Sequence, residues 1–266
     1  MILFSVFQVL RESVYLSKCL GKKYILTDTI KILENGKIVY RIKAIKNFGH
    51  IKKGQIGGWI ESEDNLSHNG ECWVEDDAVV YGNAFVCCNA SVQDNAVVYE
   101  NSYIKDNALI LGDTKIYGNA VVEGNARITG YAKIYGKAKV GGDSFITYHA
   151  KIHGNAILNG KMEISDTADI YGVVVITGNV TINRDAKIKS WEDILSITTG
   201  WNDVHTFFRC ENGDIYVICE KYNGDMNGFI CYINQIRCDG WYNNEFHLYL
   251  NMLQFVETYF GIKRKI

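Results

Sequence analysis

An aliphatic residue recurs at every sixth position from Val74 to Ile194, and this period constrains the fold more than any other feature of the chain. The position two residues earlier usually holds alanine, and turn-forming pairs such as Gly-Asn or Asp-Asn often complete the unit. A helical period of about 3.6 residues or the alternation of a simple strand does not give this spacing. The pattern is typical of a repeat architecture in which each hexapeptide supplies one short strand and one corner.

Three hexapeptides would close a triangular coil of about 18 residues, so the repeat predicts about seven stacked coils. The aliphatic and small residues would point inward, and the residues that flank each aliphatic residue would point outward. The motif resembles the left-handed parallel β-helix of hexapeptide-repeat proteins. We therefore predict a mainly β chain of this class, with an N-terminal β-hairpin and helix cap and a small C-terminal α+β module.

The changes of pattern along the chain predict three domains. Residues 1–72 form an N-terminal cap, with a short amphipathic helix near the start and a hairpin over Lys23–Ile45 that turns at Asn35-Gly36. Residues 73–195 form the β-helix, and we expect Trp59 and Trp73 to plug its open end. Residues 196–266 form the C-terminal module. Its expected elements are strands over 205–210 and 214–220 and helices over 229–236 and 245–260.

Composition excludes several classes of protein. The net charge of −2 over 266 residues argues against a generally basic nucleic-acid binder. The eight cysteines show no CxxC spacing, so we expect a reduced compartment and no metal site. Arg11, Glu12 and Lys18 interrupt the apolar stretch at the start well before it could span a membrane. These features predict a cytoplasmic protein with no membrane partner, in the host cell if a phage encodes it.

Two further segments resemble known proteins. The residues over 39–49 and 53–67, followed by Cys72-Trp73-Val74, resemble the head of a family of bacterial and phage hexapeptide-repeat proteins. This resemblance covers about residues 23–195. The stretch from Thr206 to Gly224 resembles a C-terminal module of phage-associated repeat proteins. Members of the family commonly carry a transferase label without a family-wide catalytic motif, so the resemblance implies fold and phage association more than activity.

The enzyme alternative is an acyltransferase that uses a coenzyme A thioester. Hexapeptide-repeat acyltransferases usually place a catalytic histidine in a cleft between subunits, and a protruding loop interrupts the repeat. Here the six-residue register has no insertion from Val74 to Ile194, so no such loop is expected. His153 follows Ile152 on an outer face and is the candidate base, while His149 lies at a corner. The sequence indicates no carboxylate that would orient either ring, which favours structural roles for both.

An outward column of aromatic residues is the main candidate binding surface. Positions 18 apart would stack on one face. The residues that follow the aliphatic positions there are Tyr81, Tyr99, Tyr117, Tyr135, His153 and Tyr171. The residues before them include Lys115, Lys133 and Lys151. Such a surface could stack on a planar base and neutralise phosphate. It could equally be a tyrosine ladder that stabilises the strands, or a subunit interface.

These observations favour a non-enzymatic, phage-associated binding protein without a cofactor. Its ligand would be a host protein or an anionic, nucleotide-like small molecule, and an anti-defence role is one form of this hypothesis. The alternatives are the acyltransferase and a structural or assembly protein of a phage. A second face is the candidate for homotrimer contacts, because its column before the aliphatic positions carries Phe85, Tyr103, Val121, Ile157 and Val175.

Overall fold

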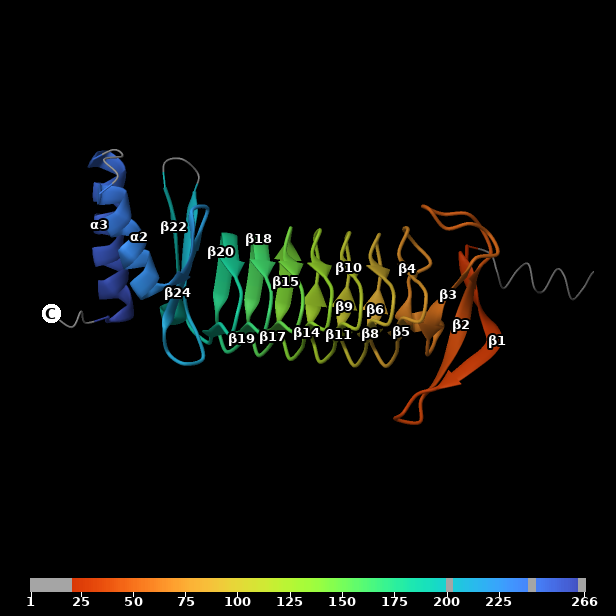
Figure 1. Cartoon of the computed structure of the whole chain (residues 1–266). Coiled ribbons are helices and arrows are strands. Elements are labelled where there is room, and N and C mark those ends of the chain that lie inside the picture. The colour runs from red at the N-terminus through yellow and green to blue at the C-terminus, as the bar shows by residue number, and fades with distance from the viewer. Residues whose placement is uncertain (1–20, 200–202, 239–242, 263–266) are drawn as a thin grey trace, which may run out of the picture.

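The chain forms an elongated column of stacked coils with a different cap at each end (Figure 1). The computed structural model describes residues 21–199, 203–238 and 243–262. The predicted parallel β-helix of about seven coils is confirmed, together with a C-terminal module that carries two helices. The helix expected near the start of the chain falls in residues 1–20, outside the described residues.

Each side of the column is a parallel sheet of very short strands. The first face belongs to a ten-stranded sheet that contains β1 (Tyr24–Ile32), β2 (Ile38–Ala44), β3 (Ile56–Ile60), β5 (Val79–Val80), β8 (Val97–Val98), β11 (Lys115–Ile116), β14 (Lys133–Ile134), β17 (Lys151–Ile152), β19 (Asp169–Ile170) and β21 (Lys187–Ile188). The antiparallel hairpin of β1 and β2 therefore continues, through β3, into the first face of the β-helix.

The other two faces share one sheet. The second face contains β6 (Phe85–Val86), β9 (Tyr103–Ile104), β12 (Val121–Val122) and β15 (Lys139–Gly142). The third face contains β4 (Trp73–Val74), β7 (Ser91–Val92), β10 (Leu109–Ile110), β13 (Arg127–Ile128) and β16 (Phe145–Ile146). The longer strands β18 (Ile157–Ile164) and β20 (Val175–Ile182) run through the corner and join the two faces.

The register between coils is 18 residues, as the repeat predicts. Ile116 pairs with Ile134, and Ile134 pairs with Ile152, on the inner side of the first face. Lys115 N donates to Ala132 O at 3.0 Å, and the same bond recurs from coil to coil. The inward aliphatic residues are almost completely buried, so each coil completes the core of its neighbours.

The corners stack as regularly as the strands. Gly118 has a φ of +76°, and a Cβ there would lie 2.8 Å from the backbone N of Gly136 in the next coil, so glycine fits this corner best. At other corners an acidic residue takes the left-handed conformation. Asp94, with φ of 58°, accepts a hydrogen bond from Gly112 N at 2.8 Å. The corner amides also bond to one another in a ladder that contains Asn89, Asn107, Asn125 and Asp143.

Aromatic residues close the N-terminal end of the core. Trp73 is fully buried, and the ring of Phe48 packs against it edge-on with centroids 5.3 Å apart. A Cβ on Gly57 would lie 2.5 Å from the Trp73 ring, so this glycine makes room for the plug. Lys23 is also buried, and its ammonium donates to Cys72 O at 2.7 Å. The prediction that Trp73 plugs the end is consistent with this packing.

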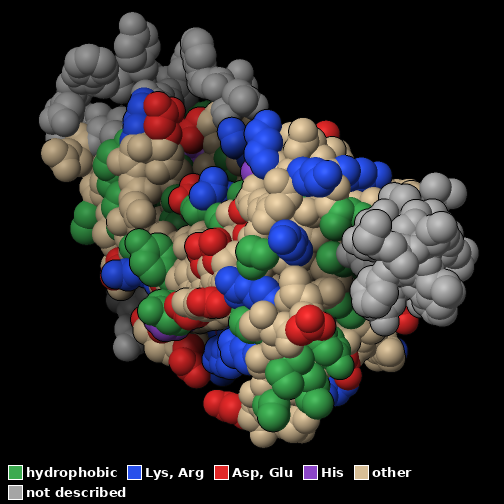
Figure 2. Space-filling model, turned by 90° about the vertical axis from the view of Figure 1, so that its right-hand side faces the viewer, with side chains coloured by type: hydrophobic (Ala, Val, Ile, Leu, Met, Phe, Trp, Pro, Cys, Tyr) green, Lys and Arg blue, Asp and Glu red, His purple; other side chains and the backbone are tan. Residues whose placement is uncertain are grey.

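The same prediction is wrong for Trp59. In β3, Ile60 aligns with the inward Val80, and Trp59 aligns with Val79, so alternation along the strand turns Trp59 outward. The Arg41 guanidinium lies 4.7 Å from the centre of the Trp59 ring. Figure 2 views the molecule from this end and shows hydrophobic side chains gathered at the lower edge, where the hairpin ends.

A four-stranded antiparallel sheet closes the C-terminal end. It contains β22 (Ile194–Thr198), β23 (Val204–Arg209), β24 (Ile215–Cys219) and β25 (Tyr222–Asp225). Phe208 and Tyr216 pack into the β-helix core, while Phe207 and Val217 pack against the helices α2 (Met226–Cys238) and α3 (Asn243–Phe260). The sheet is thus buried on both sides, between the last coil and the helix pair (Figure 1).

The last aliphatic residue of the repeat is not part of a further coil. Ile194 begins β22 and pairs with Phe208 in the C-terminal sheet. The short helices η1 (Glu63–Asn65) and η2 (Trp191–Asp193) interrupt the winding at the two ends. Asp193 accepts hydrogen bonds from the backbone N of Lys189 and Ser190, which turns the chain out of the helical path. Among the described residues, no helix combines the length and apolarity required to cross a membrane.

Replacing one inward residue with a charge tests the inward assignment. Val122 is fully buried, whereas its neighbour Val121 points outward from the same strand. We expect Val122→Asp to destabilise the fold by several kcal/mol, because the core offers the carboxylate no partner. Leu109→Asp, at an outward position in β10 on the third face, is the matched control and should change stability by less than about 1 kcal/mol. Circular dichroism during thermal unfolding measures both, and equal melting temperatures for the two variants would contradict the assignment.

Candidate functional site

The six aromatic residues of the first face form one continuous stack. Adjacent ring centroids lie 5.1, 5.0, 4.9, 4.5 and 5.2 Å apart from Tyr81 to Tyr171, and the planes deviate by at most 10°. His153 occupies one position in this stack, between Tyr135 and Tyr171. We call these six rings, together with Lys115, Lys133 and Lys151, the lysine–aromatic face.

The stack limits how the rings can bind a ligand. Each interior ring uses both of its faces on its neighbours, and the Lys37 ammonium lies 5.7 Å from the Tyr81 ring at the N-terminal end. A planar base therefore cannot stack on the interior rings as the sequence suggested, and only ring edges and hydroxyls face outward. Burial, followed by the neighbouring tyrosines, raises the pKa of Tyr99 to about 12. Such a hydroxyl stays protonated near neutral pH and can donate a hydrogen bond.

The three lysines form a column of like charges beside the stack. Lys115, Lys133 and Lys151 are exposed and occupy paired positions on adjacent strands. Within the described residues, none of their ammonium groups forms an ion pair or hydrogen bond, whereas Lys105 pairs with Glu123 at 2.7 Å. Like charges on adjacent strands repel one another. An anion bound across the column would relieve that repulsion.

His153 has the carboxylate partner that the sequence analysis did not find. Its Nε2 lies 2.8 Å from Asp169 Oδ1, and both side chains are partly exposed. Asp169 stands in the lysine column one coil further on, diagonally across from His153. The expectation that no carboxylate orients this ring is therefore wrong. The signal was present, because Asp169 breaks the lysine column, but a search along single columns overlooks diagonal neighbours.

The hydrogen bond to Asp169 fixes how the imidazole can act. An ionised carboxylate only accepts hydrogen bonds, so in the neutral ring Nε2 carries the proton and Nδ1 keeps a free lone pair. The described residues place no hydrogen-bond partner on Nδ1. The ring is thus oriented through one nitrogen and able to accept a proton at the other.

The remaining described histidines occupy structural positions or lie on the surface outside the lysine–aromatic face. His149 stacks on Tyr131 at a corner, with centroids 4.9 Å apart. His68 stacks on Tyr24 in the N-terminal cap, and burial lowers its pKa. His205 is buried beneath the C-terminal helices, where desolvation likewise lowers its pKa. The sequence-based preference for a structural role agrees with the surroundings of His149.

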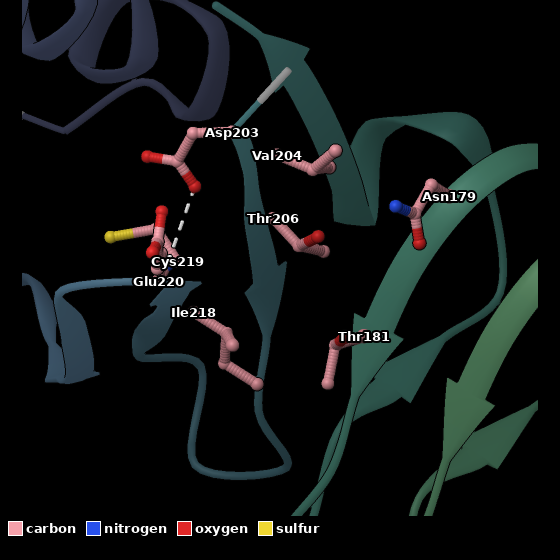
Figure 3. A pocket seen from close by; sticks show the side chains of 8 residues that line it. All are labelled: Asn179, Thr181, Asp203, Val204, Thr206, Ile218, Cys219 and Glu220. Carbon is pink, nitrogen blue, oxygen red and sulfur yellow. Dashed lines mark hydrogen bonds between the residues drawn. The ribbon is translucent and has the colours of Figure 1, made fainter. Parts of the chain in front are cut away.

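A groove lies between the last coil and the C-terminal sheet (Figure 3). Its volume is about 330 Å³, and its lining consists of Asn179, Thr181, Asp203, Val204, Thr206, Ile218, Cys219 and Glu220. Asp203 accepts a hydrogen bond from Glu220 N at 3.3 Å at one end of the groove. Sequence analysis did not predict this groove, because two modules form it. Across the described parts of the chain, no cluster of three or more His, Cys, Asp or Glu side chains has the geometry to hold a metal ion.

Comparison with known proteins finds a distant relative. Over 56 residues the chain is 34% identical to the uncharacterized acetyltransferase YdcK of Escherichia coli strain K12. The matched stretch is 21% of this chain and 17% of the relative, so the chain spans a small part of that protein. No protein-family model matches the chain. The relative is consistent with a hexapeptide-repeat protein of the transferase type.

Removing one ring tests whether the stack stabilises the column. Tyr117 stacks on Tyr99 and Tyr135, and each aromatic pair contributes about 0.5–1.5 kcal/mol beyond its buried area. We expect Tyr117→Ala to lower the free energy of unfolding by about 1–3 kcal/mol. Tyr117→Phe, which retains the ring, should have little effect in the same urea titration. A Tyr117→Ala variant as stable as the native protein would show that stacking contributes nothing.

Proposed function

We propose that this chain is a hexapeptide-repeat acyltransferase that uses a coenzyme A thioester, and that the lysine–aromatic face is its active surface. The observation that carries the proposal is the 2.8 Å hydrogen bond between His153 and Asp169. This bond orients a base beside a column of unpaired lysines, and acyl transfer from an anionic donor can use the base for proton transfer and the lysines for donor binding. The acetyltransferase name of the distant relative supports the same choice.

His153 would act as the general base. Its Nδ1 would take the proton from the acceptor's hydroxyl or amine as that group attacks the thioester carbonyl. Asp169 would stabilise the imidazolium that forms and would hold the ring in orientation. Collapse of the tetrahedral intermediate would break the carbon–sulfur bond and release coenzyme A, whose thiolate would take up the proton. The acyl group would then be on the acceptor.

The lysine column would hold the donor. Coenzyme A carries several phosphates, and ammonium groups form strong, charge-assisted hydrogen bonds with phosphate oxygens. Lys151 lies on β17, which ends just before His153, and Lys133 lies on the adjacent strand β14. A phosphate bound there would place the donor along the aromatic stack. The hydroxyl edges of the tyrosines would provide further hydrogen-bond donors beside it.

A second copy of the chain would complete the cleft. The lysine–aromatic face is the surface of a sheet, and enclosing a thioester requires another wall. The second face carries the apolar column that the sequence analysis assigned to trimer contacts, with Ile157 and Val175 exposed by 38% and 62%. We propose that a homotrimer forms through this column and sets a neighbouring chain beside His153.

Substituting His153 tests catalysis without disturbing the stack. Tyrosine is the residue at the other five positions of the aromatic column, so His153→Tyr should keep the stack and remove the base. We expect this variant to release coenzyme A from acetyl-coenzyme A at least about 100-fold more slowly in a thiol-detection assay with a panel of acceptors. Asp169→Asn should also slow it. Unchanged rates in both variants, at unchanged melting temperature, would refute the catalytic assignment.

Reversing the lysine charges tests donor binding independently of catalysis. We expect coenzyme A to raise the melting temperature of the native protein, because a ligand that binds the folded state stabilises it. The triple variant Lys115→Glu, Lys133→Glu and Lys151→Glu should lose that shift. The matched control is Lys161→Glu, an exposed lysine on the β18 strand of another face. An equal shift in the native protein and the triple variant would place the donor elsewhere.

The second candidate is a non-enzymatic binding protein that uses the same lysines. The observation in its favour is the continuous register, because no loop among the described residues protrudes over the lysine–aromatic face to cover a substrate. Its ligand would be a host protein or a nucleotide-like anion, and phage association and an anti-defence role belong to this hypothesis. Affinity capture from lysate with the native protein and with the triple glutamate variant distinguishes it. A partner retained only by the native protein, with His153→Tyr binding normally, would support this candidate.

A further inference from the structure

Two adjacent cysteines bring their sulfurs together at a corner of the second coil. Cys87 follows the inward Val86 at the end of β6, and Cys88 is the first corner residue, with a φ of 60°. In an extended strand, successive side chains point to opposite sides. The left-handed conformation of Cys88 turns its side chain back instead, so the two Sγ atoms lie 3.5 Å apart.

The surrounding coils hold this arrangement in place. Cys87 N donates to Ile104 O at 3.0 Å, and Cys88 O accepts from Cys72 N at 2.9 Å. The Tyr103 hydroxyl lies 3.3 Å from Cys87 Sγ and adds an oxygen beside the pair. Cys87 is 8% exposed, whereas Cys88 is exposed, so a small reagent can reach the pair from the Cys88 side.

The separation of the sulfurs suits a bridging atom better than a direct disulfide. A centre that binds two sulfurs at about 2.3 Å each holds them about 3.3–3.8 Å apart when the bond angle is about 90–110°, and the 3.5 Å found here lies within this range. A disulfide would require the sulfurs to approach to about 2.05 Å. It would also join residues whose Cα atoms are about 3.8 Å apart, below the usual range for disulfides of about 4.4–6.8 Å. The hydrogen-bonded backbone resists that distortion.

We propose that Cys87 and Cys88 form a two-thiol site for a thiophilic centre of low coordination number, of which trivalent arsenic is the chemical type. Soft thiolate ligands select soft centres. Structural zinc takes four ligands, and the described residues show no cluster of three or more ligating side chains. A trivalent arsenical needs only two sulfurs from the protein, with the Tyr103 oxygen beside them. This site lies on the second face and uses neither the lysines nor the His153–Asp169 pair of the acyltransferase proposal, although Tyr103 also belongs to the column proposed for trimer contacts.

The reaction of this site with an arsenoso compound is balanced without an oxidant. In phenylarsine oxide the arsenic carries one phenyl group and one oxygen. Two arsenic–sulfur bonds form, the arsenic–oxygen bond breaks, and the two thiol protons leave with that oxygen as water. Burial raises the pKa of Cys87, so its thiol is protonated near neutral pH and must release that proton as the arsenic–sulfur bond forms.

Intact-protein mass spectrometry with phenylarsine oxide tests the proposal. We expect one adduct per chain on the full protein, and we expect peptide mapping to place it on the segment that contains Cys87 and Cys88. An excess of 1,2-ethanedithiol should remove the adduct, whereas 2-mercaptoethanol, a monothiol, should leave it. Cys87→Ser and Cys88→Ser should each abolish it. Cys231→Ser, which removes another exposed thiol, is the matched control and should retain it.

Three results would overturn the site. The first is no adduct on the folded native protein, and the second is an adduct that maps to other cysteines or persists in Cys88→Ser. The third is a native protein that lacks two hydrogens before treatment and gains them on reduction, with peptide mapping showing Cys87 joined to Cys88. That result would show that the pair closes into a disulfide. Peptide mapping of the native protein decides the question even if a serine variant fails to fold.

Discussion

The parallel hydrogen bonding between coils, at a constant register of 18 residues, is the constraint on which the rest of this structure depends. A single coil buries too little apolar surface to offset the entropy lost when its residues are ordered. Stacking offsets this loss of entropy, because each coil supplies backbone hydrogen-bond partners and core contacts to the next coil. The regular corners serve the same register, since glycine or an acidic residue there fits directly against its counterpart one coil away.

The same register creates the candidate site. Outward positions 18 residues apart lie side by side on adjacent strands. Tyrosines that recur at such positions therefore form a stack of rings, and lysines that recur there form a column of positive charges. The two columns have different consequences. The stacked rings pack against one another and stabilise the sheet. The stacked ammonium groups repel one another, so this column favours the binding of an anion. His153 stacks in the aromatic column, and its hydrogen bond to Asp169 links it to the column that contains the lysines.

Irregular positions carry the distinctive chemistry of this chain. His153 interrupts a run of tyrosines and Asp169 interrupts a run of lysines, and the carboxylate of Asp169 orients the imidazole of His153. Cys88 adopts the left-handed conformation at a corner where glycine or an acidic residue is common, and its thiol meets that of Cys87. In a repeat protein the regular residues maintain the scaffold. A residue that departs from the repeat therefore adds a different chemical group in a coil and on a face that its sequence position specifies.

The sequence by itself determined the three-sided coil, the inward residues from Val74 to Ile188 and the faces, because a six-residue period turns these aliphatic residues into one core when three units close each coil. It also placed the aromatic and lysine columns, since residues 18 apart must align. Only the tertiary structure decided the contacts between residues of different columns and between different modules. The diagonal approach of Asp169 to His153 and the outward turn of Trp59 depend on how neighbouring strands meet. The groove beside the last coil depends on how the C-terminal sheet packs against that coil. Side-chain geometry between separate elements follows no sequence period, so the sequence pattern does not predict it.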